Sequence, residues 1–463
     1  MTSDWYTPVV SGVLFPFHER LKGHDTVQRL RALERSQWWT RERIAGLQRE
    51  RLKQFLTRVS ANVPYYRAVF ERLGLDASAE LETLPLLTKQ LIRDNLEDLK
   101  SETAGVLTPY NTGGSTGEPL QFFMGKARKS HDVAAKWRAT RWWGVDIGDP
   151  ELVVWGSPVE LGAQDRVCEL RDRVFRTKLV SAFEMSEERL DELVRTIQRM
   201  RPRMLFGYPS SLALIAEHSR ERGFDLSDAG VEVAFVTAEQ LFEHQEEAIR
   251  QAFSCRVANG YGGRDFGFAA HECPEGGLHL SAEDILVEIV DRDGGVLPVG
   301  DEGEIVVTHL ATSDFPFIRY RTGDVGVLSE RACACGRGLP LLEALRGRTT
   351  DFIVAADGTV MHALALIYAI RDVPGVRNFK IVQEDLHHTR VLLVAETGFS
   401  DSKTREIENG LSQRLGSGVR ITIERVDEIP TTRAGKHRYV ESRVDVRARG
   451  VGARAPASST PTP

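Results

Sequence analysis

The first hundred residues carry apolar side chains at helical spacing. Leu52, Phe55, Leu56 and Val59 fall three or four positions apart, as on one face of an amphipathic helix. Thr88 follows the loop that begins at Leu84 and is well placed to cap the start of another helix. The pattern predicts a helical N-terminal part over about residues 1–105.

The middle of the chain alternates short apolar runs with helical patterns. Four runs predict strands: Leu152–Trp155, Met204–Phe206, Val231–Val236 and Cys255–Ala258. Two amphipathic stretches predict helices: Glu187–Met200 and Glu243–Phe253. This alternation favours an α/β layer with parallel strands. Farther on, two strand-like runs flank a glycine-rich turn and predict a β-hairpin region: Ile285–Val290 and Gly303–His309.

After Gly347 the pattern changes to that of a small α+β domain. Its predicted elements, in order, are a helix, two strands joined by a hairpin turn, a helix and a last strand: Ala363–Ile370, Asn378–Gln383, Arg390–Ala395, Lys403–Leu415 and Arg420–Val426. A chain of 463 residues is also too long for one compact core. We therefore expect a large α/β domain with layered sheets over 1–346, a small mobile α+β lid domain over 347–446, and a disordered tail over 447–463.

Composition and charge narrow the function classes. The chain has 41% hydrophobic and 27% charged residues and a net charge of −6, which gives no basic footprint for nucleic acid. No apolar run is long enough to span a bilayer. The short apolar stretch from Val9 to Phe17 lacks a basic leader, so it is expected to be a core or surface-docking segment of a cytoplasmic protein. The oligomeric state, monomer or dimer, stays open.

A glycine- and hydroxyl-rich loop runs from Asn111 to Pro119. Glycines allow backbone N–H groups to approach phosphate oxygens, and the hydroxyls can donate to the same oxygens. The loop lacks the Gly-Lys-Ser/Thr ending of a kinase-type P-loop, and a plain turn is an equal alternative.

A second motif, Asn259–Asp265, follows a predicted strand. Ligands of α/β sheets bind at the carboxyl ends of strands. The tyrosine, paired glycines and carboxylate there could stack a purine and hold a metal, whereas a tight turn would need no such set. Three further motifs are weak alone: Tyr320–Asp324, Gly347–Asp351 and Thr432–Lys436.

The order of these five motifs resembles the adenylate-forming superfamily, which contains acyl-CoA synthetases, luciferases and peptide-synthetase adenylation domains. The resemblance covers nearly the whole chain, from Leu84 to Lys436. Within that superfamily the sequence is most similar to the phenylacetate–CoA ligase branch with its capsular-polysaccharide adenylate-ligase relatives. The segments that carry this similarity are Val63–Tyr66, Leu84–Thr88, Gly207–Ser210, Gly277–His279 and Cys333–Arg337.

The resemblance implies a role for each motif residue. The β- and γ-phosphates of ATP would be held by Thr112, Gly113, Gly114, Ser115, Thr116 and Gly117. The adenine site would be lined by Ala238, Glu239, Asn259, Gly260 and Tyr261. Asp324 would bind the ribose hydroxyls, Arg348 would approach the ribose and α-phosphate, and Asp265 would bind Mg²⁺. The hinge of the small domain would be Thr349, Thr350 and Asp351. Lys436 would reach the α-phosphate during adenylation, and Tyr208 and Pro209 would help to form the acyl pocket.

The implied activity is that of an acid–CoA ligase, which turns a carboxylic acid, expected to be aromatic, into an acyl-adenylate and then a thioester. ATP, Mg²⁺ and coenzyme A are the implied cofactors and substrates. One alternative keeps adenylation but transfers the acyl group to an amine, a sugar or a carrier-protein thiol. Another is a non-catalytic nucleotide-binding relative. It is motivated by Glu118 and Asp265, which stand where relatives carry Lys and Glu. Arg264 replaces a common Thr and could supply the cation missing at Glu118, and Thr350 stands where a hinge carboxylate is common.

The five cysteines are too few and too scattered for a disulfide framework. Cys273, His279, Cys333 and Cys335 nevertheless flank one predicted hairpin region and supply three thiolates and an imidazole, as in a closed structural zinc site. His271 is the competing imidazole. The alternative is reduced turn cysteines with no metal.

Overall fold

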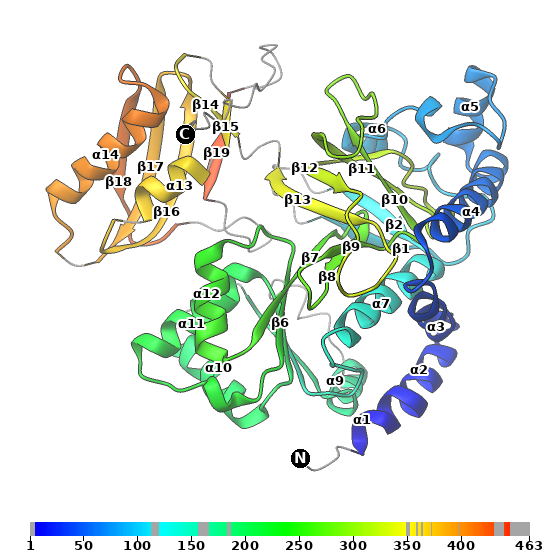
Figure 1. Cartoon of the computed structure of the whole chain (residues 1–463), viewed down its shortest axis with the longest axis horizontal. Helices are drawn as coiled ribbons and strands as arrows, with labels where there is room; N and C mark the ends of the chain where they lie inside the picture. The colour runs from blue at the N-terminus through cyan, green and yellow to red at the C-terminus, as the bar shows by residue number, and fades with distance from the viewer. Residues whose placement is uncertain are drawn as a thin grey trace, which may run out of the picture. The chain divides into compact units, whose positions relative to one another are not determined.

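The computed structural model describes residues 5–112, 120–155, 166–182, 187–348, 352–357, 360–362, 364–371, 373–396, 398–429 and 439–444. The chain forms two compact units; the first runs to Arg346 and the second begins at Gly347 (Figure 1). Among the described helices, none combines the length and the apolar character needed to cross a membrane.

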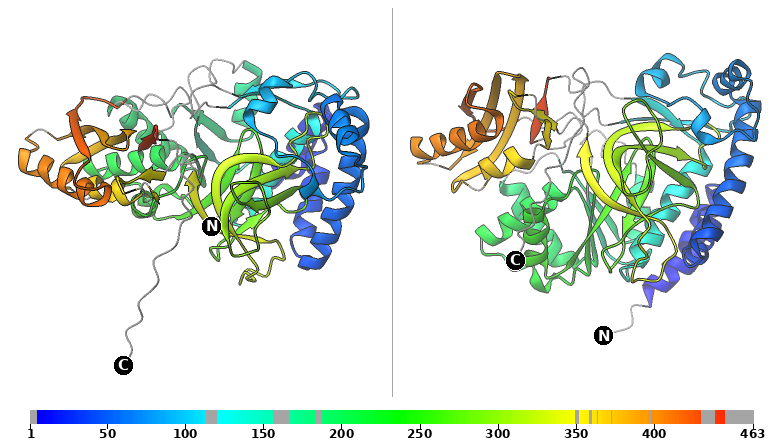
Figure 2. Two further views of the ribbon diagram at one scale, coloured as in Figure 1. Left: turned by 90° about the horizontal axis from the view of Figure 1, so that it is seen from above. Right: turned by 45° about the horizontal axis from the view of Figure 1, so that its top comes forward.

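The N-terminal part of the first unit is helical, and its helices line one side of that unit (Figure 2). They are α1 (Tyr6–Val9), the π-turn η1 (Val10–Leu14), α2 (Phe15–Leu21), α3 (Thr26–Ser36), α4 (Arg41–Asn62), α5 (Pro64–Leu73), η2 (Leu81–Thr83) and α6 (Lys89–Asp94). The predicted apolar face lies on α4, where Phe55, Leu56 and Val59 are buried. Thr88 caps α6 as predicted, because its hydroxyl accepts a hydrogen bond from the Leu91 amide at 3.2 Å.

An eleven-stranded sheet forms the centre of the first unit, in the order β10-β11-β12-β13-β9-β8-β7-β6-β5-β3-β4. Its strands are β3 (Glu151–Val154), β4 (Thr177–Val180), β5 (Met204–Gly207), β6 (Val233–Thr237), β7 (Arg256–Gly263), β8 (Gly267–Glu272), β9 (Leu278–Leu280), β10 (Ile285–Val290), β11 (Glu302–His309), β12 (Tyr320–Ser329) and β13 (Leu341–Arg348). A separate hairpin, β1 (Thr108–Asn111) and β2 (Gln121–Met124), flanks the glycine-rich loop.

The run from β4 to β7 is parallel and is covered on both faces. Its helices are α7 (Lys126–Arg141), α9 (Arg166–Val174), α10 (Glu187–Met200), α11 (Pro209–Glu221) and α12 (Glu243–Phe253). Alternate residues of a strand point to opposite faces. Leu205 accordingly packs with α10–α12, and Phe206 packs with Trp143 just beyond α7. This confirms the predicted α/β layer with parallel strands.

A buried ion pair joins α7 to the segment between β9 and β10. Arg138 of α7 donates to both carboxylate oxygens of Glu283 at 2.8 and 2.9 Å, and the two side chains are 0% and 1% exposed. The Ser36 hydroxyl, at the end of α3, donates to the same carboxylate at 2.6 Å. Arg138 also donates to the Ser281 hydroxyl at 3.2 Å. The charges are therefore paired and hydrogen-bonded, as buried charges must be.

The second unit contains a four-stranded sheet in the order β18-β17-β16-β19 and a small hairpin, β14–β15. Its elements are β14 (Phe352–Val354), β15 (Val360–His362), α13 (Leu364–Arg371), β16 (Val376–Asp385), β17 (His388–Ala395), α14 (Asp401–Leu415), β18 (Arg420–Arg425) and β19 (Val440–Ser442). The predicted hairpin at Asp385–His388 joins β16 to β17.

Candidate active site

The carboxyl ends of β5, β6 and β7 lie side by side and bring together the predicted adenine and acyl residues. Gly207 pairs with Val236, which in turn pairs with Asn259. Tyr208 follows β5 and Glu239 follows β6, so both lie at this edge of the sheet. In open α/β sheets this edge is where ligands bind.

The turn after β6 is fixed by its backbone and by one carboxylate. Ala238 adopts a left-handed backbone with φ of 70°, an uncommon conformation for a residue with a Cβ and one that often marks a functional turn. Glu239 accepts a hydrogen bond from the Ser210 hydroxyl at 2.6 Å. Ser210 lies in the first turn of α11, so this contact ties the β6 turn to the β5 turn.

An aromatic pair flanks the predicted acyl residues. The rings of Trp155 and Tyr208 stack with centroids 4.4 Å apart and planes 24° apart. Trp155 directly follows β3, and its ring also lies 5.8 Å from that of Phe206. Pro209 is the first residue of α11 and is buried. The sequence pattern predicted Trp155 only as the last residue of a strand. The signal that could have indicated a site residue is an aromatic side chain directly after a buried strand.

Two tyrosine hydroxyls hold the two predicted acidic residues. Tyr261 donates to Oδ2 of Asp324 at 2.9 Å, and Tyr320 donates to Oδ2 of Asp265 at 2.6 Å. All four residues are buried. Burial, followed by the negative charge of Asp324, raises the pKa of Tyr261 well above its ordinary value, so the hydroxyl remains a donor. The Tyr261 ring packs against Phe266 in the core, with centroids 5.4 Å apart. This packing fixes the ring, so the Tyr261 hydroxyl can position the Asp324 carboxylate.

The single carboxylate of Asp265 suits Mg²⁺, which prefers oxygen ligands and usually takes only one or two carboxylates alongside waters and substrate phosphates. The Tyr320 hydroxyl orients this carboxylate, and the Arg128 guanidinium donates to the Asp265 main-chain carbonyl at 3.1 Å. Tyr320 lies within a recognised motif, but the pattern assigned it no role of its own.

Arg264 lies beside the base of the glycine-rich loop. Its guanidinium donates to the Asn111 carbonyl at 3.2 Å, one residue before Thr112. The Thr112 hydroxyl accepts a hydrogen bond from the Leu120 amide at 2.9 Å, which closes the described base of the hairpin. The predicted phosphate residues Gly113, Gly114, Ser115, Thr116 and Gly117 lie outside the described residues, as does Glu118.

His131, Asp132 and His309 form a group of polar side chains whose ligand-type atoms lie within 4.8 Å of one another. Arg128 donates from Nε to both oxygens of Asp132, at 3.0 and 2.9 Å. The charge of the Asp132 carboxylate is therefore already neutralised by the Arg128 guanidinium. Burial, followed by the positive charge of Arg128, lowers the pKa of His309 to about 3, so its imidazole is neutral. This group is a packed polar network.

The predicted zinc residues meet in one compact cluster. Their ligand atoms all lie within 4.8 Å of one another, with Cys273 Sγ 3.6 Å from Cys333 Sγ and His279 Nε2 3.2 Å from Cys335 Sγ. A tetrahedral ion with Zn–S bonds of about 2.3 Å would separate two sulfurs by about 3.8 Å, which is close to the observed spacing. The competing His271 is not part of this group and instead packs against Phe268, with ring centroids 5.3 Å apart.

Without a bound metal ion, the His279 imidazole would be neutral and the Cys273 thiol would be protonated. Burial lowers the pKa of His279 to about 4, and its Nδ1 lies 3.2 Å from the Leu339 carbonyl. That hydrogen bond leaves Nε2 as the unprotonated nitrogen facing the sulfurs. Burial raises the pKa of the Cys273 thiol to about 12. Gly277 permits this approach, because a Cβ there would lie 2.7 Å from the Cys333 sulfur.

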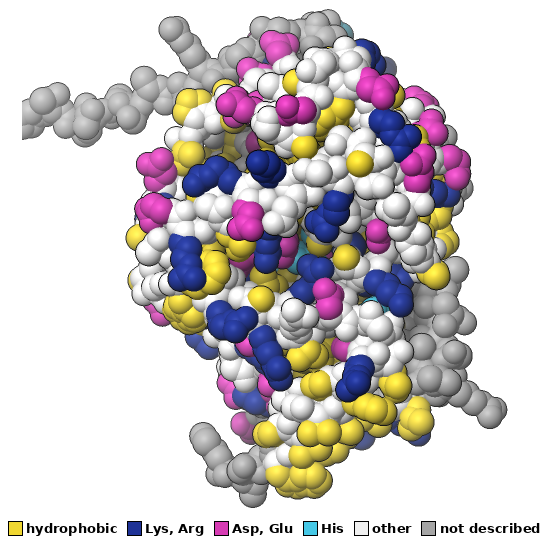
Figure 3. All heavy atoms as spheres, turned by 90° about the vertical axis from the view of Figure 1, so that its right-hand side faces the viewer, with side chains coloured by type: hydrophobic (Ala, Val, Ile, Leu, Met, Phe, Trp, Pro, Cys, Tyr) yellow, Lys and Arg dark blue, Asp and Glu magenta, His cyan; other side chains and the backbone are white. Residues whose placement is uncertain are grey.

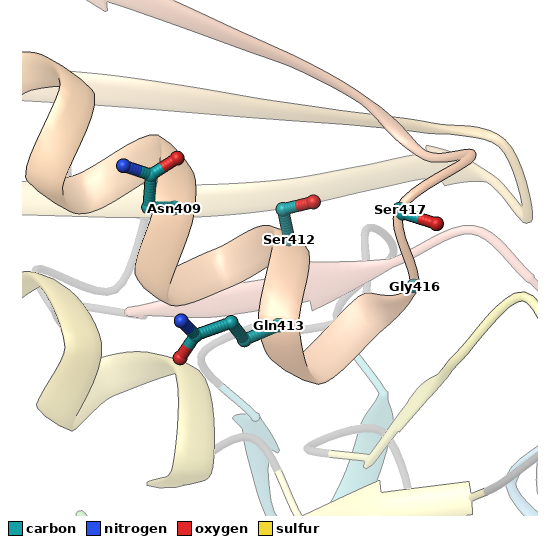
Figure 4. A pocket seen from close by; sticks show the side chains of 5 residues that line it. All are labelled: Asn409, Ser412, Gln413, Gly416 and Ser417. Carbon is teal, nitrogen blue, oxygen red and sulfur yellow. The ribbon is translucent and has the colours of Figure 1, made fainter.

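The remaining predicted site residues lie at or beyond the limits of the described ranges. Thr349, Thr350, Asp351 and Lys436 lie outside the described residues, and Arg348 is described only as the last residue of β13. A hollow of about 390 Å³ lies at the end of α14 (Figure 4); it is lined by Asn409, Ser412, Gln413, Gly416 and Ser417, none of which was a predicted site residue.

Comparison with protein families gives two matches, one in each unit. Residues 179–312 match the model of the AMP-binding enzyme family, and residues 353–443 match the model of the CapK C-terminal domain. The first match contains the edge formed by β5, β6 and β7 and the acid Asp265. Both matches support the adenylate-forming superfamily.

Curated relatives point to one branch of that superfamily. It is 24% identical to Protein CapK of Staphylococcus aureus over 401 residues, which cover 85% of this chain and 88% of that protein. It is 26% identical to Phenylacetate-coenzyme A ligase of Thermus thermophilus over 371 residues, or 74% of this chain and 78% of that one. These similarities support the branch that unites phenylacetate–CoA ligases with CapK.

Solved structures show the same fold. A 2-hydroxyisobutyryl-CoA ligase in complex with its acyl-adenylate matches with a TM-score of 0.70 and 21% identity, covering 88% of this chain and 90% of that one. This likeness confirms the predicted fold class, a large α/β domain followed by a smaller C-terminal domain.

Proposed function

We propose that this protein uses ATP to convert a carboxylic acid into an acyl-adenylate, with release of pyrophosphate, and then transfers the acyl group to coenzyme A. The observation that carries the proposal is the meeting of the implied adenine and acyl residues at the neighbouring ends of β5, β6 and β7. The Tyr261–Asp324 contact links the implied ribose residue to β7, and the Tyr320–Asp265 contact orients the implied Mg²⁺ ligand. Activities of this class in its relatives support the same reaction.

In this reaction Asp324 would accept hydrogen bonds from the ribose hydroxyls, and Tyr261 would hold its carboxylate in place. A carboxylate acceptor held in advance loses less entropy when the nucleotide binds. Gly260 and the turn through Ala238 would bring backbone groups to the adenine.

The main electrostatic problem is that an acid carboxylate must attack a negatively charged α-phosphate. Lys436 would supply positive charge there during adenylation, as the resemblance implies, and Arg264 would supply it at the phosphate loop. Asp265 would hold Mg²⁺, which, when bound, offsets phosphate charge.

The stacked Trp155–Tyr208 pair supports an aromatic acid as substrate. Aromatic rings favour offset or edge contacts with other rings, and such pairs contribute about 0.5–1.5 kcal/mol beyond area burial. Phe206 and Pro209 add apolar surface to the same strand end.

A panel of aromatic and aliphatic carboxylic acids tests the first half-reaction through acid-dependent pyrophosphate release. Aromatic acids should give the highest kcat/KM. If ATP binds but no acid releases pyrophosphate, the protein is a non-catalytic nucleotide-binding relative and the proposal fails.

The match to the CapK C-terminal domain favours a second candidate, in which the acceptor is an amine, a sugar or a carrier-protein thiol. AMP release measured with and without coenzyme A separates the two. Stimulation by coenzyme A together with a detectable thioester supports the acid–CoA ligase. Acid-dependent pyrophosphate release that coenzyme A leaves unchanged supports the other acceptor.

We also propose that Cys273, His279, Cys333 and Cys335 hold a structural Zn²⁺. The support is the sulfur–sulfur and nitrogen–sulfur spacing and the Leu339 contact that orients His279. Four protein ligands leave no open position, so the ion would contribute to folding and not to the chemistry of acyl transfer.

A further inference from the structure

The first helical stretch of the chain exposes a row of large apolar side chains. We call this row, which recurs at every fourth position, the apolar stripe: Trp5, Val9, Val13, Phe17 and Leu21. These residues are 72%, 38%, 61%, 61% and 72% exposed. Residues four apart are neighbours on the surface of a helix, so the exposed side chains of the stripe follow one another along α1, η1 and α2.

Other side chains of the same helical stretch pack against the hydrophobic core. Val10 and Phe15 are buried in a cluster with Leu30, Leu33 and Trp137. The segment is thus apolar on both faces, whereas a surface helix normally carries charged or polar residues outward. The stripe is not needed for the core, and an exposed apolar patch of this kind marks an interaction site.

The helical region that contains the stripe carries an excess of positive charge. Residues 5–60 contain eleven Lys or Arg against five Asp or Glu, a net +6, in a chain whose overall charge is −6. Their exposed basic residues form what we call the basic face: Arg20, Lys22, Arg31, Arg35, Arg43, Arg49, Lys53 and Arg58. In Figure 3 hydrophobic side chains gather at the lower end of this side of the molecule, where α1 and α2 lie, and Lys and Arg side chains lie above them.

We propose that the apolar stripe and the basic face dock the protein on an anionic lipid surface. An in-plane helix with Trp, Phe and Leu on its apolar face and basic residues beside it binds at the boundary between headgroups and acyl chains. Each Lys or Arg near an anionic leaflet adds to the attraction, and Trp favours this interfacial depth.

The charge pattern favours lipid over a second copy of the chain. A two-fold pair built on the stripe would place the same surface of each copy against the other. The two basic faces would then lie beside one another and repel, whereas anionic headgroups neutralise them.

The test is co-sedimentation of the full chain with vesicles of phosphatidylcholine alone or with roughly a third phosphatidylglycerol, at low and high salt. Wild-type protein should bind the anionic vesicles at least tenfold more tightly than the neutral ones. The double variant Val13→Asp, Phe17→Asp should lose binding to both. Arg31→Glu with Arg35→Glu should lose the preference for anionic vesicles. A matched control, Leu214→Asp with Val299→Asp, changes exposed apolar residues elsewhere and should bind as wild type does.

The stripe variant should retain acid-dependent pyrophosphate release in the absence of vesicles. This measurement distinguishes a failure of lipid docking from a failure of the proposed enzymatic function. Binding of the stripe variant equal to that of wild type, or no binding of wild type to any vesicle, would overturn the proposal. If light scattering finds a wild-type dimer in solution that the stripe variant abolishes, with no vesicle binding, the stripe is an interface between two copies and lipid docking is wrong.

Discussion

The two tyrosine–carboxylate contacts allow a paired substitution test of the nucleotide site. Tyr261→Phe removes the hydroxyl that donates to Asp324 at 2.9 Å, and Tyr320→Phe removes the one that donates to Asp265 at 2.6 Å. Each change keeps the aromatic ring, so the packing of Tyr261 against Phe266 is preserved. The two variants are therefore each other's control.

A hydrogen bond to a charged group contributes about 1.5–3 kcal/mol, equivalent to roughly 10- to 150-fold in an equilibrium constant. The Asp324 amide also donates to the Thr322 hydroxyl, at 3.1 Å, so this part of β12 retains part of its order. We therefore expect the lower end of that range: about a tenfold rise in the KM for ATP in Tyr261→Phe. In Tyr320→Phe the Mg²⁺ concentration for half-maximal activity should rise instead.

The assay is pyrophosphate release at saturating acid, titrated first with ATP at high Mg²⁺ and then with Mg²⁺ at saturating ATP. Melting temperatures of both variants show whether a change in activity reflects lost folding. The reasoning is refuted if the two variants affect the same titration to the same extent, or if Tyr261→Phe and Asp324→Asn both leave the KM for ATP unchanged.

Three further predictions follow from single groups. Lys436→Ala should slow adenylation by on the order of 10²–10³ or more yet spare thioester formation from supplied acyl-AMP, and equal losses in both half-reactions would exclude this role. Arg264→Gln should weaken ATP use about tenfold while Arg264→Lys retains most of it, as expected for a charge-assisted contact, and identical behaviour of the two variants in ATP titrations would count against a charge role. Purified protein without a His-tag should contain about one zinc per chain by metal analysis, and chelation should lower its melting temperature. Cys335→Ser should lose that zinc, whereas Cys255→Ser, at a buried cysteine outside the cluster, should keep it. A metal content near zero in the wild type would show that the cluster consists of reduced cysteines without a metal.

The sequence predicts an element well where its own apolar periodicity is strong and tertiary packing stabilises the same element. The helices Glu187–Met200 and Glu243–Phe253 and the strand Ile285–Val290 have the bounds expected from the pattern. Amphipathic repeats decide these cases because one face of each element is buried.

Elements stabilised by distant partners are harder to predict. Val440–Ser442 is a strand because it pairs in parallel with β16, some sixty positions earlier, and nothing in its own three residues indicates this. β13 likewise pairs with β9 only at Leu341 and His279. Pairings of this kind depend on tertiary context, which a local pattern does not contain.

In the site, motif order could indicate which residues belong together but not how they are oriented. Tyr261 was expected at the adenine site, yet its hydroxyl turns to Asp324 because the ring is buried against Phe266. Tyr320 received no role, because a hydroxyl contact to Asp265 across 55 positions leaves no signature in spacing. The cysteine cluster is the opposite case, since the scarcity of cysteine elsewhere pointed to the group that the structure brings together.

The buried pair of Arg138 and Glu283 limits how this protein can change over evolutionary time. Removing one partner alone leaves an uncompensated charge in the interior and costs about 3–5 kcal/mol, much of the 5–15 kcal/mol that typically separates folded from unfolded protein. Replacing both by well-packed apolar residues can be nearly neutral. Every single-step route between these two states passes through a protein of much lower stability. Lineages that carry the pair are thus expected to keep both residues or to have exchanged both, with Ser36 free to vary only after the carboxylate has gone.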